Sequence, residues 1–213
     1  MFYIHPTEKA SLSEVAKCHS ACFPNSLSTK LGLAYVAKTL DWFLCDDQRF
    51  LFHINDGNRV VGYCGGFIPR KIGDGSSSGM LQHAFSEAIK GIALKPWLLL
   101  HAEVMQQYSF IWRNIQRKVT GKLKPAPTAQ VIKTFKPYVG LVVIGVHPDY
   151  RGKGIAQQLL SEFEIRSKKL GQDHLVLSVK KSNTVAIKSY KKFGWYIAEQ
   201  NKETYMMRKE LNA

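Results

Sequence analysis

The stretch that decides the fold is Val142-Val143-Ile144-Gly145-Val146-His147-Pro148-Asp149-Tyr150-Arg151-Gly152-Lys153-Gly154-Ile155-Ala156. Its apolar beginning is rich in β-branched residues, which is typical of a strand buried on both faces. His147-Pro148 ends that strand, because proline cannot donate to a strand ladder. From Ile155 onward, apolar residues recur at helical spacing, at Leu159 and Phe163. The stretch therefore predicts a strand, a glycine loop and a helix.

The glycine loop predicts an anion site. Gly152 and Gly154 let backbone approach a ligand closely, and a helix start presents free N–H groups and the positive end of the helix dipole. A P-loop is excluded because Ile155 and Ala156 follow Gly154 where that motif needs Lys and Ser or Thr. A dinucleotide fingerprint is excluded because Gln157 stands where Gly or Ala is required. From the loop alone, a glycine turn without a ligand stays an alternative.

A second motif follows the strand expected at residues 175–179. It reads Lys180-Lys181-Ser182-Asn183-Thr184-Val185-Ala186-Ile187-Lys188-Ser189-Tyr190-Lys191-Lys192-Phe193-Gly194-Trp195. We expect Ser182 to cap a helix that ends before Gly194.

The two motifs together resemble the acetyl-CoA-dependent N-acetyltransferases of the GNAT superfamily. Arg151, Gly154 and Ala156 match the family's Gln/Arg-x-x-Gly-x-Gly/Ala signature, and the series Asn-x-x-Ala-x-x-x-Tyr-x-x-x-Gly follows from Asn183. The resemblance covers residues 138–209 closely, and the N-terminal part only by its order of elements. It implies an α/β (α+β) fold with a mixed, mostly antiparallel twisted sheet flanked by helices. It also implies that the sheet opens like a V between strands ending at Val146 and Val179.

The resemblance assigns acetyl-CoA as the co-substrate and places it in that opening. Backbone groups around Ile144 and Val146 would line the pantetheine and acetyl carbonyl, main-chain N–H groups of the loop would hold the pyrophosphate, and Asn183 would contact the coenzyme. The hydroxyl of Tyr190 would lie near the sulfur as general acid; the alternative is a core tyrosine with its hydroxyl at the rim. The implied coenzyme-binding residues are Ile144, Gly145, Val146, Arg151, Gly152, Lys153, Gly154, Ile155, Ala156, Asn183 and Tyr190.

Acetyl transfer needs a neutral amine, so a base or a water path must accept its proton. The sequence leaves that base open among His147, His101, Glu103 and a bound water. We expect direct attack by a primary amine of a small-molecule acceptor, without a metal or a covalent intermediate. Transfer to a hydroxyl stays open. Two alternatives from other classes are a coenzyme A-binding sensor or scaffold without transfer, and a binding module that uses a basic surface.

We expect one domain over residues 1–213, with a helical-hairpin insertion at about 73–126 between the third and fourth strands. The insertion would begin with a flexible linker at residues 73–79, followed by one helix from Met80 and a second from Trp97 to Val119. It could supply extra core or a homodimer surface, cover the acceptor site, or lie on a membrane. The other expected elements are strands at 2–4, 50–54, 59–68 and 204–209, helices at 12–19 and 31–44, a hairpin turn at 55–58 and a bend or bulge at Gly65-Gly66.

Lys and Arg number 30 against 16 Asp and Glu, which gives a net charge of +14. This charge predicts attraction to anions, either coenzyme A itself or an anionic acceptor. No finger spacing or aromatic RNA-binding pattern supports a specific nucleic-acid partner. The cysteines are Cys18, Cys22, Cys45 and Cys64. Without an export signal they indicate reduced thiols in the cytoplasm. The Cys18-His19-x-x-Cys22 spacing lacks a second pair to complete a metal site.

Overall fold

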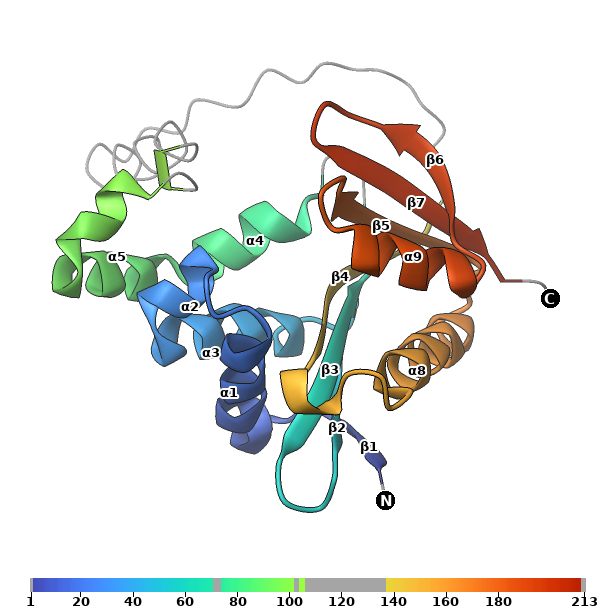
Figure 1. Ribbon diagram of the computed structural model, residues 1–213, viewed down its shortest axis with the longest axis horizontal. Coiled ribbons are helices and arrows are strands. Elements are labelled where there is room, and N and C mark those ends of the chain that lie inside the picture. The colour runs from blue at the N-terminus through green and yellow to red at the C-terminus, as the bar shows by residue number, and fades with distance from the viewer. Residues whose placement is uncertain (1, 71–73, 102–103, 106–136, 212–213) are drawn as a thin grey trace.

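The computed structural model describes residues 2–70, 74–101, 104–105 and 137–211. Their centre is a seven-stranded sheet in the order β1-β2-β3-β4-β5-β7-β6 (Figure 1). The strands are β1 (Tyr3–Pro6), β2 (Arg49–Asn55), β3 (Val60–Phe67), β4 (Val139–Val146), β5 (His174–Lys180), β6 (Tyr196–Gln200) and β7 (Thr204–Glu210). Only β4 and β5 pair in parallel, which confirms the predicted mixed, mostly antiparallel sheet.

Helices cover both faces of the sheet (Figure 1). One face carries α1 (Leu12–Cys22) and α3 (Leu33–Asp41), and the other carries α8 (Ile155–Lys169) and α9 (Thr184–Lys192). Other helical segments among the described residues are η1 (Lys9–Ser11), α2 (Leu27–Leu31), η2 (Trp42–Leu44), α4 (Ser76–His83), α5 (Phe85–Leu94), η3 (Pro96–Leu100) and η4 (Pro148–Tyr150). Residues 104–105 are also helical. None of the helices in the described ranges is both long and apolar enough to cross a bilayer.

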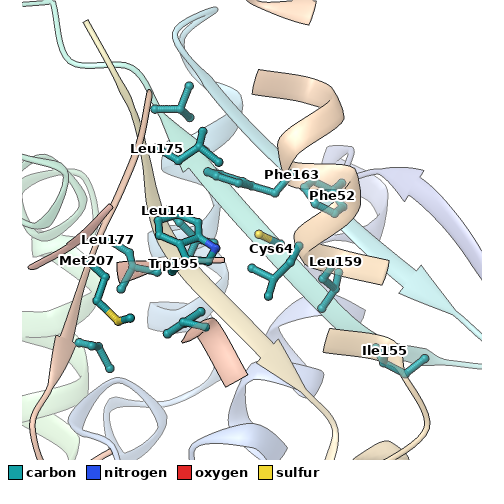
Figure 2. Close-up of a cluster of buried hydrophobic side chains, with 14 of the residues drawn as sticks. Phe52, Cys64, Leu141, Ile155, Leu159, Phe163, Leu175, Leu177, Trp195 and Met207 are labelled. Atoms are coloured by element: carbon teal, nitrogen blue, oxygen red, sulfur yellow. The ribbon is translucent and has the colours of Figure 1, made fainter. Parts of the chain in front are cut away.

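Strand β3 lies at the centre of the core, and every one of its residues is buried. Successive side chains of a strand point to opposite faces. Cys64 therefore joins the core beneath α8 and α9, and Tyr63 joins the core beneath α1 and α3. Figure 2 shows the core beneath α8 and α9, which includes Phe163 of α8 and Leu175 of β5. Two apolar layers thus hold the two central strands from both sides.

Strands β4 and β5 pair over only three positions, from Val139 opposite Leu175 to Leu141 opposite Leu177. At the point where they part, the pairing of β3 with β4 shifts by one residue between Gly65 and Gly66. Val142 is the extra residue on β4, and such a bulge bends the strand that carries it. Beyond it β4 continues to Val146 beside β3 alone. The sheet therefore opens between β4 and β5, as the resemblance implies.

The segment between β3 and β4 differs from its predicted form. Helix α4 begins at Ser76, inside the predicted linker, because Gly79 packs against Trp42; a Cβ there would lie 2.9 Å from the indole nitrogen. Packing on an apolar partner thus outweighs the weak helix propensity of serine and glycine. Pro96 opens the short η3 at the start of the predicted second helix, and residues 104–105 are again helical. The rest of that predicted helix, residues 102–103 and 106–119, lies outside the described residues.

The predicted helix over residues 31–44 is also divided. Gly32 has a φ of 112°, which is outside helical geometry, and it separates α2 from α3. The predicted strands at 50–54, 59–68 and 204–209 correspond to β2, β3 and β7. The irregularity at Gly65-Gly66 is confirmed as the register shift that accompanies the parting of β4 and β5.

Candidate functional site

The edge of β4 beyond the parting carries backbone groups without a strand partner on the β5 side. Hydrogen-bonded and non-bonded pairs alternate along an antiparallel ladder. The His147 N–H donates to the Val61 carbonyl at 2.9 Å, so Gly145 occupies the next bonded position. Ile144 and Val146 fall between these positions. Their backbone N–H and carbonyl groups therefore point away from β3, toward the opening left by β5.

Because Gly145 has no side chain, β4 packs closely against Tyr63 of β3 and Cys22 of α1. A Cβ at this position would lie 2.6 Å from the Tyr63 ring and 3.1 Å from the Cys22 sulfur. The Tyr63 hydroxyl is 2.6 Å from Nδ1 of His19, and the Nε2 of His19 is 3.0 Å from the Ser28 hydroxyl. Burial lowers the pKa of His19 to about 4, so the ring is neutral at pH 7. This network behind β4 is not visible in the sequence, because its members are separated by up to 44 residues.

The loop after β4 leads directly into α8. Gly152 and Gly154 both have φ values of 78°, in the left-handed region that favours glycine. Gly154 is the N-cap of α8 and has no side chain to accept from the first-turn N–H groups. The N–H groups of the first turn have no preceding helical carbonyl to accept their hydrogen bonds. A Cβ added at either glycine would meet no atom within 4 Å. The backbone of the loop therefore borders open space that a ligand can enter.

Polar contacts tie this loop to the turn between β2 and β3. The Tyr150 hydroxyl donates to the Asp56 carboxylate, and this hydrogen bond holds the pKa of Asp56 well below its usual range. Arg59 lies 2.9 Å from the Asp149 carboxylate. The ammonium of Lys153 sits 4.7 Å from the centre of the Tyr150 ring. The loop is thereby positioned, and it carries the positive charge that an anion would meet.

Arg151 connects the loop to the end of β4. Its side chain donates to the Val146 carbonyl and to the Cys22 carbonyl, both at 3.4 Å. Its own N–H donates to the Pro148 carbonyl at 3.2 Å. The N–H groups available to an anion therefore begin at Gly152, and the Arg151 side chain positions the loop.

Asn183, rather than the predicted Ser182, caps α9. It immediately precedes the first helical residue, Thr184, and its side-chain oxygen accepts from the Ala186 N–H at 3.2 Å. An N-cap side chain satisfies a donor that the helix leaves unpaired. The cap uses the oxygen of the carboxamide, and the NH₂ group keeps its donors.

Tyr190 lies in the core beneath α8 and α9, in the same apolar cluster against which Ile144 and Val146 pack. It is only 8% exposed, and its ring centre is 6.0 Å from that of Trp195. Burial raises the pKa of its hydroxyl above the ordinary value, with a smaller contribution from Cys64. No described residue forms a hydrogen bond with this hydroxyl. Tyr190 therefore stays protonated and uncharged throughout the physiological pH range.

The candidate bases occupy structural positions or lie outside the described chain. Nδ1 of His147 accepts from the Asp149 N–H at 3.4 Å, which makes it the cap of η4. Nε2 of His101 lies 3.3 Å from the Lys30 ammonium. Glu103 lies outside the described residues. These contacts assign the base to none of the three.

A family model described as "Acetyltransferase (GNAT) family" matches residues 12–195, nearly the whole chain. The chain belongs to the GNAT acetyltransferase family. This finding confirms the resemblance carried by the glycine loop and the Asn183–Gly194 series. The opening between β4 and β5 and the N-terminus of α8 are thus parts of a GNAT fold.

Curated relatives match short parts of this GNAT protein. A mycothiol acetyltransferase of Corynebacterium aurimucosum is 37% identical over 59 residues, which are 28% of this chain and 19% of that protein. An acetyltransferase of Yersinia pestis is 35% identical over 68 residues, 32% of this chain and 45% of that protein. The chain thus aligns with less than half the length of either relative.

Solved structures share the fold over the full chain. The PaiA N-acetyltransferase of Thermoplasma acidophilum, solved in complex with coenzyme A, has a TM-score of 0.56 to this GNAT protein at 12% sequence identity. The alignment covers 99% of both chains. At this level of identity the likeness establishes the arrangement of elements.

Proposed function

We propose that this GNAT protein transfers an acetyl group from acetyl-CoA to a primary amine of a small molecule by direct attack in a ternary complex. The observation that carries the proposal is the parting of β4 from β5. It exposes the backbone groups of Ile144 and Val146 to the opening, and that opening ends at the glycine loop of α8. A strand edge followed by a helix N-terminus suits a ligand with an amide-containing arm and a phosphate group.

The loop supplies the phosphate contacts in this proposal. N–H groups from Gly152 through Ala156 bind the pyrophosphate, which the positive end of the α8 dipole further stabilises. Lys153 and Arg59 add positive charge beside the loop. Gly145 keeps β4 tight against Tyr63, so that Ile144 and Val146 present their groups to the pantetheine arm. The NH₂ group of Asn183 donates to the coenzyme from the α9 side.

Tyr190 and the β4 backbone supply the chemistry. The amine nitrogen forms a bond to the acetyl carbon as the carbon–sulfur bond breaks, and the departing thiolate takes a proton from the Tyr190 hydroxyl. Burial keeps that hydroxyl protonated at neutral pH, so the proton is present when the carbon–sulfur bond breaks. N–H groups of β4 stabilise the negative charge that develops on the acetyl oxygen. The amine attacks in its neutral form, after its ammonium proton has left to a base or through water. The nitrogen loses a second proton as the amide forms, and this proton replaces, through water, the one that Tyr190 gave to the sulfur.

The charge of the protein favours an acceptor that carries anionic groups besides its amine. The chain has a net charge of +14, and attraction between opposite charges raises the local concentration of such a substrate. The four cysteines are free thiols, which suits a reducing cytoplasmic compartment.

The proposal is tested by measuring thiol release from acetyl-CoA with pairs of acceptors that differ only in an amine or a hydroxyl at the same position. Each pair is presented in a neutral and a carboxylated or phosphorylated form. We expect thiol release with amines, faster for the anionic forms, and an acetamide product by mass spectrometry. Release with the alcohols alone, with an ester product, would contradict N-acetylation. Acetyl-CoA binding without release for any acceptor would favour a sensor or scaffold.

A further inference from the structure

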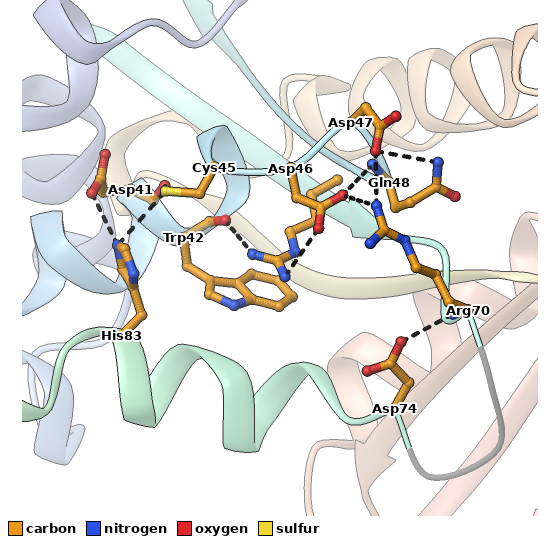
Figure 3. A network of polar contacts seen from close by, with 10 residues as sticks. Asp41, Trp42, Cys45, Asp46, Asp47, Gln48, Arg70, Asp74 and His83 are labelled. Atoms are coloured by element: carbon orange, nitrogen blue, oxygen red, sulfur yellow. Dashed lines mark hydrogen bonds and ion pairs between the residues drawn. The ribbon is translucent and has the colours of Figure 1, made fainter.

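Three side chains of metal-binding type meet where α3 and α4 end. Asp41 is the last residue of α3, Cys45 follows η2, and His83 is the last residue of α4. One ligand atom from each lies within 4.8 Å of the others, and within the described ranges this is the one such group of three. Nε2 of His83 is 3.0 Å from Oδ2 of Asp41 and 3.9 Å from the Cys45 sulfur. Figure 3 shows the imidazole directed toward both partners.

We infer that Asp41, Cys45 and His83 bind one Zn²⁺ ion, with water as the fourth ligand, and that the ion fastens α4 to the end of α3. Carboxylate, thiolate and imidazole are the donors that zinc takes in proteins. Zinc bonds of about 2.0–2.3 Å place tetrahedral ligand atoms roughly 3.3–3.7 Å apart. The distances of 3.0 and 3.9 Å lie on either side of that range, and the Asp41 carboxylate lies within 4.8 Å of the Cys45 sulfur, so side-chain rotations complete the site.

The surroundings of this trio already hold a cation. The ammonium of Lys38 lies 2.8 Å from Oδ2 of Asp41, so a cation already pairs with this carboxylate. The Lys38 side chain is 41% exposed and can move into solvent when the ion binds. Arg70 is engaged elsewhere, at 2.9 Å from Asp46 (Figure 3).

Cys45 is the cysteine that a metal can reach. It is exposed, whereas Cys18, Cys22 and Cys64 are buried. Its thiol donates to the Asp41 carbonyl at 3.2 Å, which keeps the sulfur on the side of the trio. Zinc takes a thiolate, so binding releases the thiol proton to solvent.

The packing of α4 explains why His83 arrives at this point. Gly79 lies against the Trp42 indole, and the Arg49 guanidinium stacks 3.8 Å from the ring centre of Trp42. One turn later, α4 ends at His83 beside the end of α3. A bound ion would join the ends of two helices through Asp41 and His83, which are 42 residues apart in sequence. A metal that binds only the folded arrangement stabilises it.

The site is tested by titrating the metal-free protein with Co²⁺, which reports thiolate ligation through sulfur-to-cobalt charge-transfer absorption. We expect saturation at one Co²⁺ per chain, release of one proton, and displacement of the absorption by Zn²⁺. Hydrogen exchange provides a second measurement: amides of α4 should become more protected with Zn²⁺, whereas those of α8 should not change. Neither readout depends on acetyl transfer.

Matched variants separate a metal site from an ordinary ion-pair network. Cys45→Ser should abolish the charge-transfer absorption, and His83→Ala should abolish Zn²⁺-dependent protection of α4. Asp47→Asn removes an exposed carboxylate that pairs with Arg70 and should leave metal binding unchanged. Lys38→Met removes the competing cation and should tighten metal binding. No charge-transfer absorption in the unaltered protein, or absorption that survives Cys45→Ser, would overturn the assignment.

Discussion

Replacing Tyr190 by phenylalanine is expected to lower kcat for acetyl transfer by about 10²–10⁴-fold, the usual contribution of a positioned general acid. The affinity for acetyl-CoA should stay unchanged, because the proton is needed only as the carbon–sulfur bond breaks. Folding stability should also be retained, since no described residue forms a hydrogen bond with this hydroxyl. Steady-state kinetics, equilibrium binding of acetyl-CoA and thermal unfolding of the same preparation measure the three quantities.

Tyr196→Phe is the matched control for this change. Tyr196 lies on β6 and is 48% exposed, and removal of its hydroxyl should alter none of the three measurements. A Tyr190→Phe protein with an unaltered kcat would show that Tyr190 is a core residue and that another group protonates the thiolate. A thioester with a leaving thiol of lower pKa should partly restore the rate of Tyr190→Phe, because it needs less help from an acid.

Gly154→Val is expected to raise the dissociation constant of acetyl-CoA by roughly 10–150-fold, equivalent to one lost charge-assisted hydrogen bond of about 1.5–3 kcal/mol. A β-branched residue is strained at the φ of 78° that Gly154 adopts. Relief of that strain would turn the N–H groups at the start of α8 away from the pyrophosphate. The free energy of unfolding should also fall by about 1–3 kcal/mol. Calorimetric titration and urea unfolding provide the two values.

Gly171→Val is its control at the other end of the same helix. Gly171 has a φ of 70°, and a Cβ there would also meet no atom within 4 Å. The two variants should therefore lose similar stability, and only Gly154→Val should lose affinity for the coenzyme. Equal loss of affinity in both would mean that the loop contributes no specific contact and that binding follows general stability.

The sequence predicted the strand, glycine loop and helix at the centre of the candidate site, for physical reasons. The run from Val142 to Val146 is long and apolar, and the spacing from Ile155 to Phe163 is helical, so both elements are strongly determined by local pattern. The glycines at 152 and 154 occupy left-handed backbone, which is a requirement that sequence can reveal. The placement of these residues at the opening is an observation; their contacts with the coenzyme stay predictions.

Features that depend on tertiary packing were not predictable in the same way. Strand β6 is an edge strand, and most of it is exposed. Tyr196–Gln200 therefore lacks the alternation of buried and exposed positions that would indicate a strand. Gly65-Gly66 predicted an irregularity, but its extra residue, Val142 of β4, lies in a uniformly apolar run and is defined only by pairing with β3. The helical start of α4 depends on contact with Trp42, which is 34 or more residues away. The meeting of Asp41 with His83 likewise exists only in the folded chain.

The central claim is that the opening between β4 and β5 binds acetyl-CoA, and thermal unfolding with acetyl-CoA, coenzyme A and NAD tests it most directly. A ligand at about one hundred times its dissociation constant adds roughly 2.7 kcal/mol to the free energy of unfolding. For a chain of this length that corresponds to a rise of about 5–10 °C in Tm. We predict such a rise with acetyl-CoA and coenzyme A and none with NAD. No rise with either coenzyme, or an equal rise with NAD, would contradict the claim.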